Sequence, residues 1–332
     1  MDKIKMKSKY ILITGASSGL GLSHAIYLAH QGYKVIGTYK SKKDKEILKE
    51  IFIRDHTRYK YSNKKESILK KEKILISQDI LERLDLLLDQ IVFIQLDVTK
   101  SQEINQLFDN ISDSAIDVLI NNAGIGYFGP VEESPIESWI HQFEVNVLGY
   151  IGMIQAILPQ MRERRRGLII NTASMAGMAT IPFQAGYSVS KAGVIRLTDS
   201  LRVELKPFNI HVTTISPGDI NTSFDAATVT LHKEEARYKS DEIASMLQEF
   251  PLQKNSPYYS KALIVWTNII QNLIISPPPI TVSKMIAKII STKNPKSLYT
   301  AGSFLQTTLL LFLQRMISRN FFLWIIAKFY GV

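Results

Sequence analysis

A serine, a tyrosine and a lysine are spaced in this chain of 332 residues so that they could transfer a proton. Ser174 precedes Tyr187 by thirteen residues, and Lys191 follows the tyrosine by four. Residues four apart share a helix face, so the ammonium of Lys191 would lie beside the phenol of Tyr187. A phenol with a pKa of about 10 acts as a base at neutral pH only if that pKa is lowered by about 3 units, which requires ~4 kcal/mol. A unit charge at ~4 Å supplies about that much at an effective dielectric constant of ~20.

The tyrosine and lysine alone also fit an ordinary pair of surface residues. The surrounding motifs must therefore decide whether the pair belongs to an active site. Residues 14–21 read Thr-Gly-Ala-Ser-Ser-Gly-Leu-Gly, directly after a short apolar run. Glycines there permit a tight turn and a close backbone approach to a diphosphate. The helix that follows offers free N–H groups and the positive end of its dipole. A glycine turn without a ligand is the alternative, but its place between a strand and a helix favours a dinucleotide site.

Short apolar runs alternate with helical patterns through the first two thirds of the chain. The runs are rich in β-branched residues and do not alternate cleanly, as expected for strands buried on both faces of a parallel sheet. This pattern predicts an α/β fold, a Rossmann-like doubly wound parallel sheet with helices on both faces. The expected strands are Tyr10–Thr14, Lys34–Tyr39, Val92–Asp97, Val118–Asn121, Gly167–Thr172 and His211–Ser216, and the expected helices include Gly21–Gln31, Ser101–Ile111 and Tyr187–Lys206.

The domain organisation follows from where this alternation stops. The sheet pattern ends after Pro217, so we expect a catalytic domain over residues 1–250 and a C-terminal helical extension over residues 251–332. Residues 41–91 form a charged insertion far longer than the dozen or so residues that a crossover needs. We expect a surface helix or helical hairpin with a mobile middle near Thr57–Lys65 and an amphipathic helix over Ile80–Leu88. The insertion is either solvated without a function of its own or an arm that faces a partner or a membrane.

These motifs together resemble those of the short-chain dehydrogenase/reductase family. The similarity spans Lys9–Thr222, in the expected order and with no motif position broken. The matching residues are the glycine-rich turn Thr14–Gly21, the Asn-Asn-Ala-Gly of Asn121–Gly124, the tetrad Asn146, Ser174, Tyr187 and Lys191, and the later motif Pro217, Gly218 and Thr222.

The resemblance implies a role for each member of the tetrad. Tyr187 would be the general acid/base and Ser174 would bind the substrate oxygen. Lys191 would lower the tyrosine pKa and bind the nicotinamide ribose, while Asn146 would hold a water that links the lysine to solvent. Hydride transfer to a ketone leaves an alkoxide-like oxygen that needs a proton, so a positioned phenol agrees with this chemistry.

The resemblance also implies a set of cofactor contacts along the ends of the strands. One of them, Asp97, has the alternative of capping the helix that starts at Ser101. The implied contacts are Gly15, Ser17, Ser18, Gly19, Leu20, Gly21, Lys40, Asp97, Val98, Asn122, Ala123, Gly124, Tyr187, Lys191, Pro217, Gly218, Ile220 and Thr222.

The end of the second expected strand indicates which cofactor is bound. An acidic residue there would bind the ribose hydroxyl of NAD, whereas a basic residue suits the 2′-phosphate of NADP. Tyr39 stands at the acidic position, Lys40 and Ser41 follow, and no carboxylate appears before Asp44. Because a phosphate gains from a cation and from a hydroxyl donor, the sequence favours NADP over NAD.

The C-terminal quarter differs in charge from the rest. Phe250–Val332 holds nine Lys or Arg and no Asp or Glu, and this accounts for nearly all of the net charge of +10. Ser297–Gln314 is uncharged but too polar for a membrane span, and Phe321–Tyr330 is apolar but short. The segment either packs on the domain or across a dimer, or lies on a membrane surface. Its Tyr299–Gly302 turn and following helix resemble the hydroxysteroid and retinol dehydrogenase-like branch of the family.

The amino-acid composition excludes several other classes of protein. The chain has no cysteine, which excludes disulfides, zinc-thiolate sites and thiol nucleophiles, and we expect no metal. The residues before Phe250 are close to neutral overall, unlike a nucleic-acid binder. Met1–Lys9 shows no apolar signal segment, so we expect a cytoplasmic protein, or one peripheral on the inner face of a membrane.

The sequence thus predicts an oxidoreductase that transfers a hydride between NADP(H) and a hydrophobic secondary alcohol or ketone. A steroid-like, retinoid-like or other lipid-like carbonyl fits the apolar C-terminal segment. We expect a homodimer or homotetramer, with Asp219–Glu249 as a mobile lid. A non-catalytic NADP-binding redox sensor, or a scaffold on the same fold, is the alternative.

Overall fold

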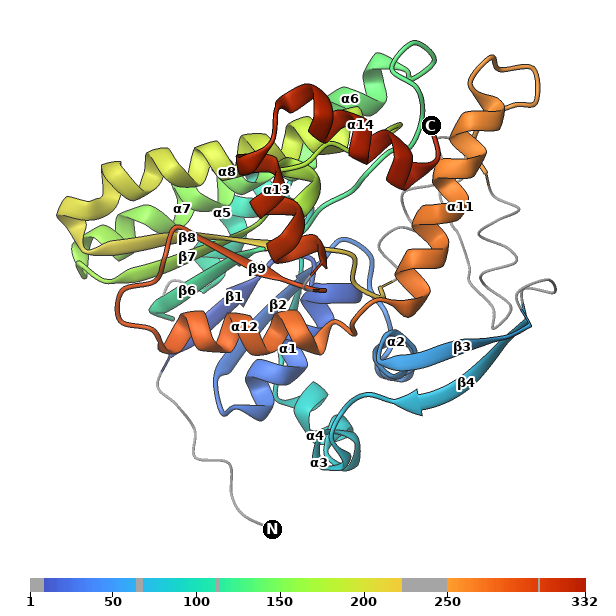
Figure 1. Ribbon diagram of the computed structural model, residues 1–332. Helices are drawn as coiled ribbons and strands as arrows, with labels where there is room; N and C mark the ends of the chain where they lie inside the picture. The colour runs from blue at the N-terminus through green and yellow to red at the C-terminus, as the bar shows by residue number, and fades with distance from the viewer. Residues whose placement is uncertain (1–8, 64–67, 112–113, 223–249, 304) are drawn as a thin grey trace.

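A seven-stranded sheet forms the centre of the computed structural model, which describes residues 9–63, 68–111, 114–222, 250–303 and 305–332. The strand order is β5-β2-β1-β6-β7-β8-β9, and every neighbouring pair is parallel (Figure 1). This order places β1 beside both β2 and β6, as in a doubly wound fold. The strands are β1 (Tyr10–Ile13), β2 (Lys34–Tyr39), β5 (Val92–Gln95), β6 (Ile116–Asn121), β7 (Gly167–Thr172), β8 (Ile210–Pro217) and β9 (Leu298–Ala301).

Helices cover both faces of the sheet and bury successive strand residues on opposite sides. Ile11 and Ile13 of β1 pack in one apolar core with α1, α2, α4 and α12, while Leu12 packs in a second core with α5, α7 and α8. The predicted Rossmann-like fold is therefore confirmed. The helices are α1 (Gly19–His30), α2 (Lys45–Asp55), α3 (Gln78–Glu82), α4 (Leu84–Asp89), α5 (Ser101–Asn110), α6 (Ile136–Phe143), α7 (Gly149–Glu163), α8 (Ala185–Leu205), α11 (Tyr259–Ile275), α12 (Ile280–Ser291), α13 (Leu310–Met316) and α14 (Arg319–Tyr330).

All six strands expected from the sequence are present, but the expectation that the sheet ends after Pro217 was wrong. A seventh strand, β9, pairs with β8 in the register Thr214↔Leu298. The residues interpreted as a turn thus extend the sheet, and the bend follows at Gly302, whose φ is +144°. Three of the four β9 residues are only half-buried, so the strand lacks the continuous apolar run that marks the inner strands.

The charged insertion differs from the expected helical hairpin. Its middle forms a separate two-stranded antiparallel sheet of β3 (Thr57–Asn63) and β4 (Ile68–Ile74). The helix expected over Ile80–Leu88 is present as the short α3 and α4. The insertion is also part of the core, because Phe52 and Leu87 are fully buried against the sheet's helices. The residues of β3 were expected to be a mobile middle and those of β4 to be helical, because their polar residues hide the strand pattern.

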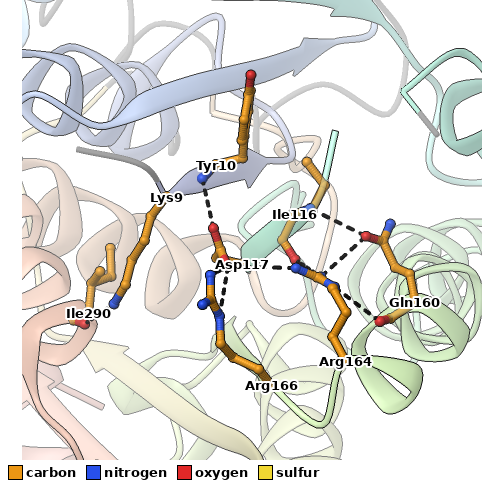
Figure 2. A network of polar contacts seen from close by, with 8 residues as sticks. All are labelled: Lys9, Tyr10, Ile116, Asp117, Gln160, Arg164, Arg166 and Ile290. Atoms are coloured by element: carbon orange, nitrogen blue, oxygen red, sulfur yellow. Dashed lines mark hydrogen bonds and ion pairs between the residues drawn. The ribbon is translucent and has the colours of Figure 1, made fainter. Parts of the chain in front are cut away.

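A polar cluster joins the strands at the sheet edge opposite their carboxyl ends (Figure 2). The register between β1 and β6 shifts at Asp117, and the freed carboxylate accepts a hydrogen bond from the backbone N–H of Tyr10 at 3.1 Å. Arg166 pairs with the same carboxylate, and Arg164 Nη2 donates to the carbonyl oxygen of Ile116 at 2.6 Å. Because Asp117 is only 5% exposed, these cations offset the burial of its charge.

Candidate active site

A cavity of about 860 Å³ lies where the carboxyl ends of the parallel strands meet. In an open α/β sheet this is the edge at which ligands bind. It brings together nearly all of the residues predicted from the sequence. Those that line it are Gly15, Ser17, Ser18, Gly19, Leu20, Lys40, Asp97, Val98, Asn122, Ala123, Gly124, Ser174, Tyr187, Lys191, Pro217, Gly218, Ile220 and Thr222.

Two predicted residues, Gly21 and Asn146, lie behind the wall of the cavity instead. Gly21 is needed for the turn itself, because a Cβ there would lie 2.1 Å from the carbonyl oxygen of Gly15. Gly15 has a φ of +66°, in the left-handed region that favours glycine. The turn leads directly into α1, whose N-cap Ser18 makes no side-chain capping bond and whose first turn has no acidic residue. The helix therefore presents uncapped N–H groups to the cavity, which fits an anionic diphosphate.

The wall beside this turn is fixed by hydrogen bonds between the ends of β1 and β6. The hydroxyl of Thr14 accepts from the backbone N–H groups of Asn122 at 2.9 Å and of Ala123 at 3.0 Å. The side chain of Asn122 donates back to the carbonyl oxygen of Thr14 at 3.0 Å. These reciprocal bonds hold two strand ends in one geometry, so this end of the cavity is preorganised.

The lysine of the motif is buried at the base of the cavity. Lys191 is 2% exposed, and its Nζ donates to the carbonyl oxygen of Thr172 at 2.9 Å. The same nitrogen lies 5.8 Å from the ring centre of Tyr187 and 5.5 Å from that of Tyr150. Burial lowers the pKa of Lys191 to about 7, whereas burial, together with neighbouring Tyr187, raises the pKa of Tyr150.

The serine is positioned by the turn that follows β7. Ser174 has an extended backbone, and its Oγ accepts the backbone N–H of Ala176 at 3.1 Å. The loop that carries it begins at Ala173, whose N–H donates to the carbonyl oxygen of Ile215 in β8 at 2.8 Å. The serine hydroxyl proton remains available to a substrate oxygen, since this bond uses only an acceptor lone pair.

Asn146 lies in a π-helical turn (Glu144–Leu148) and is fully buried. Its amide bonds both backbone groups of Ile125 at 2.8 Å and donates to Ser190 Oγ at 3.0 Å. A Cβ added to Gly124 would lie 3.2 Å from Asn146 Oδ1 and 3.4 Å from Lys191 Nζ. Glycine thus keeps open the space between the asparagine and the lysine. Both amide hydrogens of Asn146 are engaged, so a water would have to bind through an oxygen of this residue.

The mouth of the cavity beyond β2 is basic. Lys40 Nζ pairs with Asp97 Oδ2 at 3.0 Å, and Lys40 is 65% exposed. Partial burial alone would raise the pKa of Asp97, but hydrogen bonds from Thr99 and the cation of Lys40 hold it below its ordinary value. Lys43 Nζ donates to the carbonyl oxygen of Ser17 at 3.3 Å. With Ser41 and Lys42 also lining the cavity, this end can hold a further phosphate.

Sequence reasoning missed the part of the cavity wall that later helices form. His141 comes from α6, Ile269, Asn272 and Leu273 come from α11, and Tyr330 ends α14. Ile181 and Gln184 come from the segment between β7 and α8. The helices α11 and α14 carry no motif, so only their packing in space could reveal this wall. The predicted lid lies outside the described residues except for residues 219–222.

No three or more His, Asp or Glu side chains are grouped as metal ligands in the described part of the chain. Within the same described ranges, no helix combines the length and the apolar character needed to span a bilayer.

Comparisons with known proteins identify the family of this chain. The short chain dehydrogenase pattern matches residues 72–232. The probable short-chain type dehydrogenase/reductase VdlC of Helicobacter pylori is 30% identical over 251 residues, which are 75% of each chain. The chain belongs to the short-chain dehydrogenase/reductase family. Members of this family are NAD(P)-dependent oxidoreductases that act on CH–OH groups.

Two further relatives and one solved structure place the chain within the family. A 3-ketodihydrosphingosine reductase of Bacteroides thetaiotaomicron is 35% identical over 221 residues, 66% of each chain. Human 17-beta-hydroxysteroid dehydrogenase type 1 is 32% identical over 66% of this chain and 59% of its own length. The expected likeness to hydroxysteroid dehydrogenases is therefore confirmed. A short-chain dehydrogenase from Streptomyces avermitilis superimposes with a TM-score of 0.66 at 25% identity, over 94% of this chain and 95% of its own.

Proposed function

We propose that this protein reduces a ketone on a hydrophobic, lipid-like molecule with NADPH, or oxidises the corresponding secondary alcohol with NADP. The observation that carries the proposal is the single cavity shared by Ser174, Tyr187 and Lys191 and by the uncapped N-terminus of α1. The nicotinamide of the bound cofactor would supply or accept the hydride. The residues of the chain hold the substrate oxygen and move its proton.

The proton would pass through the phenol of Tyr187. Ser174 Oγ–H donates to the substrate oxygen and orients it, while Tyr187 gives that oxygen a proton during reduction. Lys191 lies close enough to the Tyr187 ring to favour the phenolate by charge. Burial holds the pKa of Lys191 at about 7, so the positive charge beside Tyr187 is lost as the pH rises through neutrality. Asn146 acts here by positioning, because its amide bonds fix the Ile125 backbone beside them.

The basic mouth supports NADP rather than NAD. Lys40, Ser41 and Lys43 line the end of the cavity where the second strand stops, and a 2′-phosphate there would compete with Asp97 for Lys40. We expect Lys40→Ala to weaken NADPH binding by about tenfold and to leave NADH binding nearly unchanged. Fluorescence titration of both cofactors measures this. An equal loss of affinity for NADPH and NADH would show that Lys40 contributes only general positive charge and does not bind the 2′-phosphate.

The part of the cavity wall that later helices form supports an amphipathic substrate. Ile269, Leu273 and Tyr330 offer apolar surface, whereas His141 and Gln184 offer polar groups to the same cavity. A carbonyl with a neighbouring polar substituent and a long apolar chain matches this division. The Bacteroides relative named as a 3-ketodihydrosphingosine reductase, a reductase of a lipid ketone, gives the same direction.

The decisive experiment replaces the general acid. We expect Tyr187→Phe to lower kcat by about a thousandfold, because a positioned acid contributes about 10²- to 10⁴-fold, with NADPH affinity unchanged. The assay is NADPH oxidation with long-chain 3-oxo lipids, steroids and retinoids as substrates. Tyr27→Phe on α1 is the matched control and should retain activity.

Full activity in the Tyr187→Phe variant would overturn the catalytic role. The wild-type protein could bind NADPH but oxidise it with none of these substrates. That result would support the alternative of a non-catalytic NADP-binding sensor or scaffold. The homodimer or homotetramer expected from the sequence stays a prediction, which light scattering of the purified protein checks.

A further inference from the structure

The last two helices expose an apolar surface, which we call the C-terminal face: Leu309, Phe312 and Met316 on and just before α13, with Phe321 and Trp324 on α14. Four of these side chains are more than half exposed, with Met316 at 66% and Trp324 at 54%. The rings of Phe321 and Trp324 stack with centres 5.5 Å apart. Single exposed apolar residues are common, but four on two consecutive helices and a fifth just before them mark an interaction surface.

The opposite side of α14 holds this helix in place. Phe322 and Ile326 are 4% exposed and pack on Ala179, in the loop that follows Ser174. Gln314 of α13 donates to the carbonyl oxygen of Met178 in the same loop at 2.8 Å. The outward direction of Phe321 and Trp324 is therefore set by a packed inner side. Figure 1 shows α14 (red) ending next to α11 (orange).

Cations flank the C-terminal face, and no acidic residue lies in its segment. Arg315, Arg319 and Lys328 are exposed on the same two helices. Residues 250–332 contain nine Lys or Arg and no Asp or Glu. Aromatic and aliphatic side chains bordered by cations suit the headgroup layer of a bilayer with anionic lipids.

We propose that the C-terminal face docks this protein on the surface of an anionic membrane, with α13 and α14 lying in the interface. A second copy of the chain fits less well, since a two-fold contact would bring the same three cations together without an acidic partner. Docking requires no spanning helix, and none of the described helices is suited to be one. Phe321 and Trp324 would enter the headgroup layer, and the three cations would pair with lipid phosphates.

The position of this face also connects the membrane to the cavity. Tyr330 at the end of α14 lines the cavity, and its carbonyl oxygen accepts from Asn268 of α11 at 3.1 Å. A lipid leaving the bilayer beside α14 would thus meet the apolar wall of Ile269 and Leu273 first. This last step rests on the proposed function, whereas docking itself does not depend on catalysis.

The test is flotation of the full chain with vesicles of phosphatidylcholine alone or with about one third phosphatidylglycerol. We expect binding to the anionic vesicles, weakened by added salt. The double variant Phe321→Ser/Trp324→Ser should lose at least about tenfold in partitioning, because it removes the apolar contact. The triple variant Arg315→Gln/Arg319→Gln/Lys328→Gln should lose about a hundredfold on anionic vesicles.

Two control variants locate the surface. Val189→Ser/Val203→Ser removes exposed apolar side chains of α8, and Lys284→Gln/Lys288→Gln/Lys293→Gln removes three cations on and just after α12. Both should bind vesicles like the wild type. The proposal is overturned if wild-type protein stays with the soluble fraction, or if controls and C-terminal variants lose binding equally. It is also overturned if Phe321→Ser/Trp324→Ser changes only the oligomeric mass, because the face would then join two copies. NADPH oxidation of a detergent-dispersed substrate reports the proposed function separately.

Discussion

Two clusters of buried polar side chains both contain a basic group whose pKa is lowered by burial, but only one of them has access to the cavity. The first, at the cavity, centres on Lys191, Asn146 and Ser190. The second, which we call the sealed cluster, consists of Ser23 and His24 on α1, His56 after α2, and Ser283 on α12. All members of both clusters are at most 2% exposed. In both, burial shifts the pKa of a basic group downward.

The sealed cluster is a linear chain of hydrogen bonds from His24 to His56. His24 Nδ1 lies 2.8 Å from Ser283 Oγ, which lies 2.9 Å from Ser23 Oγ. Ser23 Oγ lies 3.2 Å from His56 Nε2. The backbone N–H of Ile280 donates to that same nitrogen at 3.1 Å, so His56 is neutral there and its Nδ1–H donates to the carbonyl oxygen of Phe52 at 2.7 Å.

The two clusters differ in access to the cavity. Lys191 lines it, whereas none of the four side chains of the sealed cluster does. A buried titratable group with access to a ligand can move a proton to it, while one without access can only affect stability. The sealed cluster joins the charged insertion to α1 and α12, so the insertion is held to the core by polar bonds as well as apolar contacts.

The largest expected effect comes from removing the buried lysine. We expect Lys191→Met to lower kcat by about a thousandfold, since the Tyr187 phenol loses its cation. The free energy of unfolding should stay equal or rise at pH 7, because a desolvated ammonium is removed. The folded pKa of about 7 lies below the ordinary 10.5, so the wild type gains stability as pH rises between these values and the variant does not. Urea unfolding across this range measures the difference, and a strongly destabilised variant would contradict it.

A smaller effect, on stability and not on rate, is expected from the sealed cluster. His56→Ala leaves the N–H of Ile280 without its buried acceptor and opens a space beside Phe52, so we expect a loss of about 3 kcal/mol. The kcat of the folded variant should equal that of the wild type. His211→Ala on β8, which is only half-buried, serves as the control. A loss of kcat without a loss of stability would remove the distinction between the clusters.

The smallest effect per residue is the pH dependence of that same cluster. Burial lowers the pKa of His24 to about 3 and that of His56 to about 4, both below the ordinary 6.5. The unfolded chain therefore takes up protons first, so this stability is complete above about pH 6.5 and is lost as pH falls. Between about pH 6.5 and 5 each histidine should remove about 2 kcal/mol. Urea unfolding at both pH values checks this, and the variant His24→Gln/His56→Gln should show a flatter dependence.

Much of the fold was predictable because its signals are local. The buried runs around Ile11 and Ile169 are apolar over their whole length, which marks inner parallel strands. The edge strand at Leu298 and the hairpin of Thr57–Asn63 lack that mark. Their pairing depends on neighbours far away in the chain, such as Thr214 beside Leu298. The sealed cluster could not be predicted from the sequence for the same reason, because its His24 and Ser283 are separated by 259 residues.

The sequence by itself determined the chemistry of this protein. A tyrosine and a lysine four residues apart on one helix, and a glycine turn ahead of another, fix their local geometry wherever the helices lie. Only the tertiary structure decided what surrounds that chemistry. Tyr330 and Ile269 reach the cavity because α11 and α14 pack over the strand ends, and Trp324 faces outward because Phe322 packs inward. Such contacts arise from the burial of whole helices, which no short spacing in the sequence records.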